Sequence, residues 1–172
     1  MKTIKLTFIG LIFTLFALHS QTSQAQEVDT RIGGLLAFGT EVSQPAIGVN
    51  AEFGVMDQLA ISPSFLYYFP KSEHGIKANY FEINGNANYY FIEDENDFDV
   101  YGLAGLTYLN ASVSYDGIGS EYFSGASSSS FGLNLGAGAN MHLDGFMPFA
   151  EIKYQIISGG QLVIAAGVKF EI

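Results

Sequence analysis

The last twelve residues of the chain, Gln161 to Ile172, read QLVIAAGVKFEI. From Leu162 onward every second residue is apolar, and Phe170 is the last aromatic of this series. The intervening positions include Lys169 and Glu171, so charge and apolar surface alternate. Successive side chains of a strand point to opposite faces. The chain end therefore predicts a strand that separates two different environments.

The same alternation recurs along the chain. It is nearly perfect over three other segments, Ile47–Val55, Tyr80–Phe91 and Phe131–His142, and weaker over four more, Arg31–Gly39, Leu59–Phe69, Phe98–Leu109 and Phe146–Ile156. An even number of strands of roughly ten residues is typical of transmembrane barrels. We therefore predict an all-β fold, an eight-stranded antiparallel up-and-down transmembrane β-barrel. A soluble secreted barrel of the lipocalin kind, with apolar residues inside and polar ones outside, is the competing architecture.

The N-terminus has the features of a secretory signal peptide. Lys2 and Lys5 precede the apolar stretch Leu6–Leu18, and Ser23-Gln24-Ala25 offers small residues before a cleavage point. The apolar stretch is too short for a membrane-anchoring helix, which needs about 20 residues. We predict a signal peptide over residues 1–25 and one barrel domain over residues 26–172. The sequence contains no cysteine, which excludes a lipoprotein anchor and disulfides.

The chain is acidic, apolar and rich in glycine. Removal of residues 1–25 takes away two lysines and no acids, so the 7 basic and 17 acidic residues become 5 and 17, a net charge of −12. Nucleic acid is therefore excluded as a predicted partner. A mean hydropathy of +0.23 with 20 glycines and only 4 prolines favours β-structure in contact with lipid.

The connections between the expected strands form two sets. One set is short: Met56–Gln58, Ile92–Asp97 and Leu143–Gly145; the other is Thr40–Pro45, Pro70–Lys77, Ala111–Ser129 and Ser158–Gly160. Outer-membrane barrels have short periplasmic turns and longer extracellular loops, so we expect residues 111–129 outside the cell. This loop mixes tyrosine with serine and glycine, which suits either an extracellular ligand or an idle flexible loop.

Aromatic residues on the expected lipid face fall near the two membrane interfaces. The expected periplasmic girdle is Phe53, Tyr89, Phe91, Phe98 and Phe170, and the outer girdle is Phe65, Tyr67, Phe69, Phe81, Tyr108, Phe131 and Tyr154. Such girdles are typical of membrane barrels. The segment Tyr101–Gly105 does not alternate cleanly, which leaves the facing of its strand open by one residue. Pro63 cannot donate to a ladder, so we expect a local bulge or kink there.

The candidate site is a set of charged residues on the expected inner face. Its members are Arg31, Glu52, Glu82, Glu151, Lys153, Lys169 and Glu171. The interior of an eight-stranded barrel is just wide enough for side chains to fill, and charges there must be paired or hydrated. We expect an ion-pair network that plugs the lumen. A gated pore for small solutes or ions is the alternative, and paired glutamates acting as general acid and base would need a substrate cleft that nothing in the sequence implies.

Other chemistry is not indicated. His74 has no nucleophile at a fixed spacing, and His142 lies at the periplasmic end of its expected strand. The acidic run Glu93–Asp97 lacks the spacing and the glycine of a calcium loop and is expected to be a solvated turn. We therefore predict no catalytic residues, no metal site and no cofactor, and that the protein is not an enzyme.

The chain resembles small outer-membrane barrels of the OmpA/OmpX type and the porin-like β-barrel family of Bacteroidetes. The residues that carry the resemblance are EFGVMDQLAISPSFLYYF from Glu52 to Phe69, PFAEIKY from Pro148 to Tyr154, and the C-terminal alternation. The resemblance implies a location in the outer membrane, contact with its lipid, and recognition of the C-terminal strand by the barrel-assembly machinery. Such strands usually end in phenylalanine, whereas this one ends in Ile172.

Overall fold

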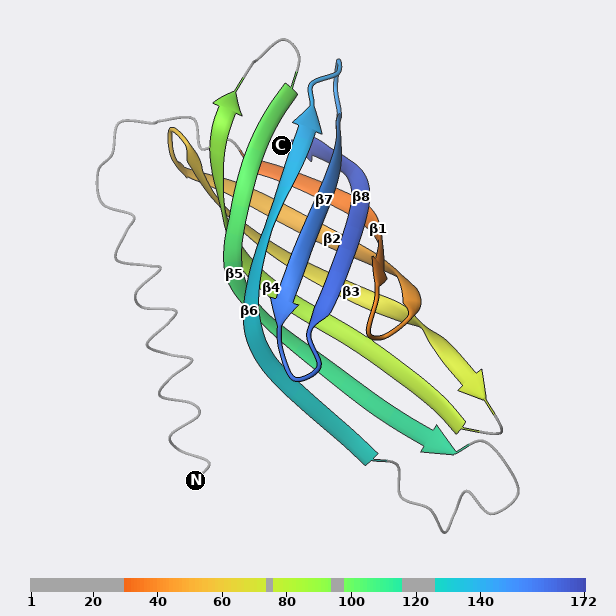
Figure 1. The fold of residues 1–172 in the computed structure, drawn as a ribbon. Coiled ribbons are helices and arrows are strands. Elements are labelled where there is room, and N and C mark those ends of the chain that lie inside the picture. The colour runs from red at the N-terminus through yellow and green to blue at the C-terminus, as the bar shows by residue number, and fades with distance from the viewer. Residues whose placement is uncertain (1–29, 74–75, 94–97, 116–125) are drawn as a thin grey trace, which may run out of the picture.

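The chain folds into a closed β-barrel (Figure 1). The computed structural model describes residues 30–73, 76–93, 98–115 and 126–172, so the predicted signal peptide lies outside the described residues. The strands are β1 (Thr30–Gly39), β2 (Gln44–Met56), β3 (Leu59–Glu73), β4 (Ile76–Glu93), β5 (Phe98–Tyr115), β6 (Ala126–Met141), β7 (Met147–Ile156) and β8 (Gln161–Glu171). The predicted eight-stranded antiparallel barrel is confirmed.

Each strand pairs with its neighbours in the sequence, and β1 closes the barrel against β8. The closing ladder runs from the pair of Arg31 and Glu171 to the pair of Gly39 and Val163. Closure gives every strand of the barrel wall two hydrogen-bonded neighbours. In a lipid bilayer this is necessary, because an unpaired backbone group there has no water to bind.

The two faces of the wall differ as the alternation predicted. The outer face carries exposed large apolar side chains, and most buried polar side chains lie on the inner face. A lipocalin-like arrangement with polar residues outside is therefore wrong. In β5, Tyr101 and Leu103 are buried inside whereas Leu106 is exposed outside. This settles the facing of the fifth strand and keeps Phe98 on the outer face, as its place in the expected girdle requires.

The aromatic residues of the outer face form connected groups. Four rings follow one another from β3 to β6, with centroid distances of 6.1 Å for Phe65 and Phe81, 6.1 Å for Phe81 and Tyr108, and 4.7 Å for Tyr108 and Phe131. Toward the other end of the barrel, Tyr89 and Phe91 lie 5.4 Å apart. Rings at the two ends of an apolar wall match the interfacial girdles of membrane barrels.

We call the end of the barrel that carries the start of β1 and the end of β8 the terminal rim, and the opposite end the loop rim. At the loop rim β3, β4, β5 and β6 continue well past the ends of the other strands (Figure 1). The predicted loop of residues 111–129 is therefore too long: residues 111–115 belong to β5 and residues 126–129 to β6. Residues 70–77 are likewise mostly strand, in β3 and β4. Residues 116–125 lie outside the described residues.

Pro63 interrupts pairing without shifting it. The β3–β4 ladder passes through the pair of Pro63 and Gly85 in register. On the other side, β2–β3 pairing is absent between the pair of Asn50 and Ser64 and the pair of Phe53 and Ile61, and it resumes in the same register. Of the predicted bulge or kink, the bulge is therefore wrong, because neither ladder shifts register at Pro63. Proline removes one donor from the ladder, and the wall tolerates the local gap.

Candidate functional site in the barrel lumen

The charged residues predicted for the lumen come together mainly around two buried glutamates. Glu52 of β2 contacts Arg31 of β1 and Lys169 of β8. Glu82 of β4 contacts Lys153 of β7. Arg31 and Glu52 are direct partners in the β1–β2 ladder, whereas Lys169 and Lys153 come from strands far along the sequence from their glutamates. These long-range contacts exist because the barrel wall brings the inner faces of its strands toward a common axis.

The Glu52 cluster is saturated with donors. The carboxylate lies 3.1 Å from Arg31 Nη1 and 2.9 Å from Lys169 Nζ, and it accepts hydrogen bonds from Tyr90 at 2.6 Å and Asn88 at 2.9 Å. Glu52 and Lys169 are each only 1% exposed. A buried carboxylate in a narrow lumen requires such pairing, because an unpaired charge there carries a large desolvation cost.

Lys169 joins this cluster to aromatic residues. Its Nζ also donates to Asn140 Oδ1 at 3.1 Å and lies 5.2 Å from the ring centroid of Tyr101 and 4.9 Å from that of Phe149. A cation over an aromatic face is stabilised by the ring quadrupole, more so when it is desolvated. The buried ammonium of Lys169 therefore has both a carboxylate and aromatic rings as partners in the interior.

The Glu82 cluster is a second network on the loop-rim side. Glu82 lies 3.1 Å from Lys153 Nζ and accepts hydrogen bonds from Tyr68 at 2.8 Å and Gln155 at 2.8 Å. Gln161 extends the network by donating to Gln155 at 2.8 Å. The Gln155 amide also donates to Thr107 and Asn134. Asn134 in turn donates to Asn84 and Asn86, so the hydrogen-bond network extends across the lumen.

Two of the predicted lumen residues, Glu151 and Glu171, lie outside the Glu52 and Glu82 clusters. Glu151 accepts a hydrogen bond from Tyr101 at 3.2 Å and lines a small internal cavity together with Lys153. Glu171 lies at the terminal rim with its side chain 64% exposed, 3.7 Å from Arg31 Nε. Glu171 therefore borders the aqueous mouth, because the last residue of β8 has left the enclosed part of the barrel.

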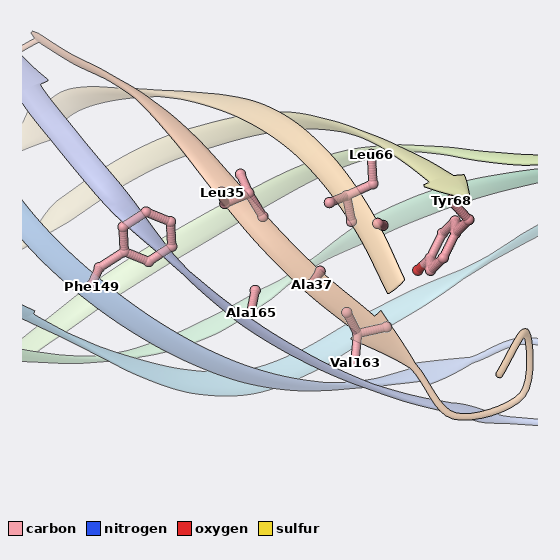
Figure 2. Packing of buried hydrophobic residues seen from close by; sticks show 8 residues of the cluster. Leu35, Ala37, Leu66, Tyr68, Phe149, Val163 and Ala165 are labelled. Atoms are coloured by element: carbon pink, nitrogen blue, oxygen red, sulfur yellow. The ribbon is translucent and has the colours of Figure 1, made fainter. Parts of the chain in front are cut away.

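Apolar side chains fill the space beside the charged clusters. The inward-facing group is Leu35, Ala37, Ala46, Leu66, Tyr68, Phe149, Val163 and Ala165, most of which are labelled in Figure 2. Val42, Tyr80 and Leu109 pack against it. The backbone N–H of Val42 donates to Gln161 Oε1 at 3.1 Å, which ties the β1–β2 connection to β8. The internal cavity beside Glu151 has a volume of about 10 Å³, close to the minimum for a single water molecule.

Sequence reasoning missed the inward-facing tyrosines. Tyr68, Tyr90 and Tyr101 are buried and bond to the glutamates of the lumen, yet aromatic residues were expected at the outer interfaces. The sequence contained a signal for one of them: Tyr90 is separated from Glu82 by an even number of residues along β4, so the two side chains lie on the same face of the strand. The hydroxyl explains the exception, because a buried tyrosine can satisfy a carboxylate while its ring fills volume.

The remaining candidate chemistry is limited. His142 Nε2 lies 2.9 Å from Asp99 Oδ1 near the terminal rim, and His74 is outside the described residues. Among the residues that the structure describes, no group of three histidine or acidic side chains could hold a metal ion. No described helix is long and apolar enough to cross a membrane.

Several solved structures share this fold. The N-terminal β-barrel domain of Pseudomonas aeruginosa OprF is 18% identical, with a TM-score of 0.65 over 84% of this chain and 97% of that one. Neisserial surface protein A is 16% identical, with a TM-score of 0.64 over 87% and 100%. Ail, the attachment invasion locus protein of Yersinia pestis, is 15% identical, with a TM-score of 0.60 over 84% and 97%.

The sequence itself identifies the family. A comparison with curated proteins finds no match. The family model described as outer membrane protein beta-barrel domain, however, matches residues 9–170, nearly the whole chain. Together with the closed eight-stranded barrel, this places the protein in the cell outer membrane. The chain belongs to the outer membrane protein β-barrel domain family.

Proposed function

We propose that the protein is a plugged outer-membrane barrel with a structural or surface-interacting role and no enzymatic activity. The observation that carries this proposal is the pairing of Glu52 with Lys169 and of Glu82 with Lys153 across the lumen. Apolar side chains fill much of the space around these pairs, and the cavity beside Glu151 is only about 10 Å³. A hydrated ion needs a continuous path, and the side chains packed around these pairs support a lumen that interrupts such a path.

Conductance tests this proposal directly. The mature protein, refolded and inserted into a planar bilayer, is expected to give no stable single-channel steps at physiological salt. A small porin-like channel for solutes or ions is the alternative function, and the polar lining of the lumen is the observation that favours it. Reproducible ohmic steps would establish the channel and overturn the plug. Denatured protein added at the same concentration is the control for leakage caused by detergent.

We further propose that the terminal rim faces the periplasm and the loop rim faces the exterior, following the usual asymmetry of turns and loops. The β6–β7 and β7–β8 connections lie at opposite rims, and each has an exposed residue, Asp144 and Ser158 respectively. The native chain has no cysteine. An impermeant maleimide should therefore label Ser158→Cys but not Asp144→Cys on intact cells. The reverse result would invert the topology.

Three finer assignments belong with this proposal. Outer-membrane lipid is the expected partner of the apolar wall, and the barrel-assembly machinery is the expected partner of β8, whose Phe170 faces outward. The porin-like family of Bacteroidetes is the proposed subgroup, on the strength of the segments Glu52–Phe69 and Pro148–Tyr154.

A structure of Ail contains the heparin analogue sucrose octasulfate. A net charge of −10 makes a polyanion of that kind an unfavourable ligand for this chain.

A further inference from the structure

The outer face of the wall has an apolar groove over β8, β1, β2 and β3. In β1 the outward position of Gly34 lacks a side chain, whereas its outward neighbours on the strand are large, so the wall is hollowed there. Two hollows of about 690 and 670 Å³ meet at this glycine and share Val49 and Phe65. One extends to Tyr67 toward the loop rim and the other to Phe170 at the terminal rim. Together they form one groove between the two aromatic girdles, which we call the wall groove.

The floor of the wall groove contains the gap in the β2–β3 ladder. Ala51 and Pro63 lie across from each other in this gap, and both line the groove. The β3–β4 ladder continues through Pro63, which indicates that the nitrogen of Pro63 points toward β2, the side on which pairing is lost. Proline has no N–H to donate. In the described ladders, the carbonyl of Ala51 therefore has no backbone donor opposite it.

An acceptor without a donor is unfavourable in a wall that faces lipid. The hydrocarbon of a bilayer offers no water to a backbone carbonyl. Ala51 lies two residues from Phe53 of the girdle near the terminal rim, which is about 7 Å along the strand. Because aromatic girdles lie at the level of the headgroups, the carbonyl is just inside the hydrocarbon. A donor that belongs to the first part of a lipid chain therefore reaches its depth.

We propose that the wall groove binds an acyl chain of a membrane lipid that carries a hydroxyl group close to its carboxyl end. The hydroxyl donates to the carbonyl of Ala51, and the rest of the chain lies over Gly34 toward the loop rim. The headgroup lies in the leaflet on the side of the terminal rim. In lipid all apolar surfaces are alike to water, so packing and hydrogen bonds decide which chain is held. The proposal deepens the lipid contact proposed above by naming its site and the class of lipid.

A lipid fits this groove better than a second copy of the barrel does. The family and the closed barrel place this wall in the outer membrane, so the groove opens to lipid chains. Two copies related by a two-fold axis along the membrane normal would meet at equal depths. The outward side chains near the depth of Ala51, such as Ile32 and Ile61, are apolar and offer its carbonyl no donor. A hydroxylated chain fills the hollow and supplies that donor.

Native mass spectrometry of the full mature barrel measures the preference for the hydroxyl. The probes are two phosphatidylethanolamines that differ in one chain, β-hydroxypalmitoyl or palmitoyl, titrated in the same detergent. The hydroxylated lipid is expected to bind about five- to tenfold more tightly. Equal affinities would overturn the proposal and would assign the carbonyl to a water in the internal cavity lined by Ser62 and Ser64. Free β-hydroxypalmitic acid should bind more weakly than the lipid, and equal binding of the acid would make a lipid the wrong ligand.

Pro63→Ala tests the hydrogen bond. Alanine restores an N–H opposite the carbonyl of Ala51, so the preference for the hydroxylated lipid should disappear, while the affinity for the palmitoyl lipid should change little. Pro45→Ala is the matched control, because this proline of β2 does not line the wall groove and its replacement should keep the preference. An unchanged preference in Pro63→Ala would mean that the hydroxyl is recognised elsewhere, and the proposal would be wrong.

Gly34→Leu tests the groove itself. A Cβ at this position meets its nearest atom, the carbonyl oxygen of Gly48, at 4.0 Å, so leucine fills the hollow without a clash and should weaken both lipids about tenfold. Gly85→Leu is the matched control, since this outward glycine has nothing within 4 Å and does not line the wall groove. If Gly34→Leu instead dissociated a dimer and left lipid binding intact, the groove would belong to a second copy, and the proposal would be wrong. A conducting lumen would overturn the plug and leave these results unaffected.

Discussion

Glu52 accounts for much of the order in the lumen. Arg31, Asn88, Tyr90 and Lys169 reach its carboxylate from β1, β4 and β8. Replacing one partner of a buried ion pair leaves the remaining charge without compensation, which costs more than the pair contributes. The identity of this side chain therefore affects stability far beyond the value of a single contact.

The first prediction concerns this carboxylate. Glu52→Gln removes the negative charge that Arg31 and Lys169 share, so the free energy of unfolding should fall by roughly 3 to 5 kcal/mol. Urea titrations in lipid vesicles would measure it. Glu171→Gln is the matched control, because that side chain is exposed at the rim and should change stability by less than about 0.5 kcal/mol. Similar values for the two variants would show that the interior network does not stabilise the barrel.

The second prediction concerns packing at Gly138. A Cβ at this position would collide with the ring and hydroxyl of Tyr101, which is fully buried and cannot move aside. Gly138→Ala should therefore destabilise the barrel by about 1 to 3 kcal/mol, the usual cost of overpacking. Gly85→Ala is the control, since nothing lies within 4 Å of the added methyl group. Equal stability of the two variants would contradict the inward position of Tyr101.

At the scale of one strand, adjacent residues lie on opposite faces and in different environments. In β7, Ile152 is 47% exposed on the outer face whereas Lys153 is 3% exposed beside Glu82. A shift of one residue would exchange these environments along the whole strand. Lysine in lipid and isoleucine among carboxylates would both be unfavourable, so the register of β7 is strongly specified.

The third prediction tests this facing. Ile152→Arg places a charge on the lipid face and should lower the free energy of unfolding in vesicles by roughly 2 to 4 kcal/mol if the position lies near mid-membrane. Ile152→Met tests the effect of changed shape without charge and should be nearly silent. Lys153→Arg keeps its charge opposite Glu82 and should cost less than Ile152→Arg. If Ile152→Arg were tolerated while Lys153→Leu stabilised the protein, the faces would be reversed.

At the scale of the molecule, closure is the property that matters most. The β1–β8 ladder joins residues near the two ends of the described chain. Polar partners in the lumen are also remote in sequence, as with Glu52 and Lys169. The barrel wall and its interior therefore form together, and no single hairpin of this chain can bury its polar face alone.

The fourth prediction follows from closure. A barrel without free edges in its wall resists unfolding in detergent, because no strand can peel away first. The refolded protein should therefore migrate differently on SDS gels before and after boiling. Far-ultraviolet circular dichroism should show β-structure in the unboiled sample. Identical migration together with a helical spectrum would contradict the barrel.

The sequence by itself determined the strands, their faces and the kind of surroundings on each side. Period-2 alternation between lipid and a polar lumen is a local property. Lys169 can therefore be assigned to the lumen face and Phe170 to the lipid face without reference to the rest of the chain. The inner-face positions of Glu52, Glu82 and Lys153 could be predicted from the same alternation. The alternation weakens where both faces meet water, and for this reason the outer ends of β5 and β6 were mistaken for a loop.

Only the tertiary structure decided which residues meet inside. The pairing of Lys169 with Glu52 and of Lys153 with Glu82 depends on how far each strand is staggered around the barrel. The inward tyrosines and the apolar group around Val163 also follow from the shape of the space that remains. Alternation specifies a side of the wall, whereas the stagger of the closed ladder sets the height and angle of each side chain. That stagger is a property of all eight strands together.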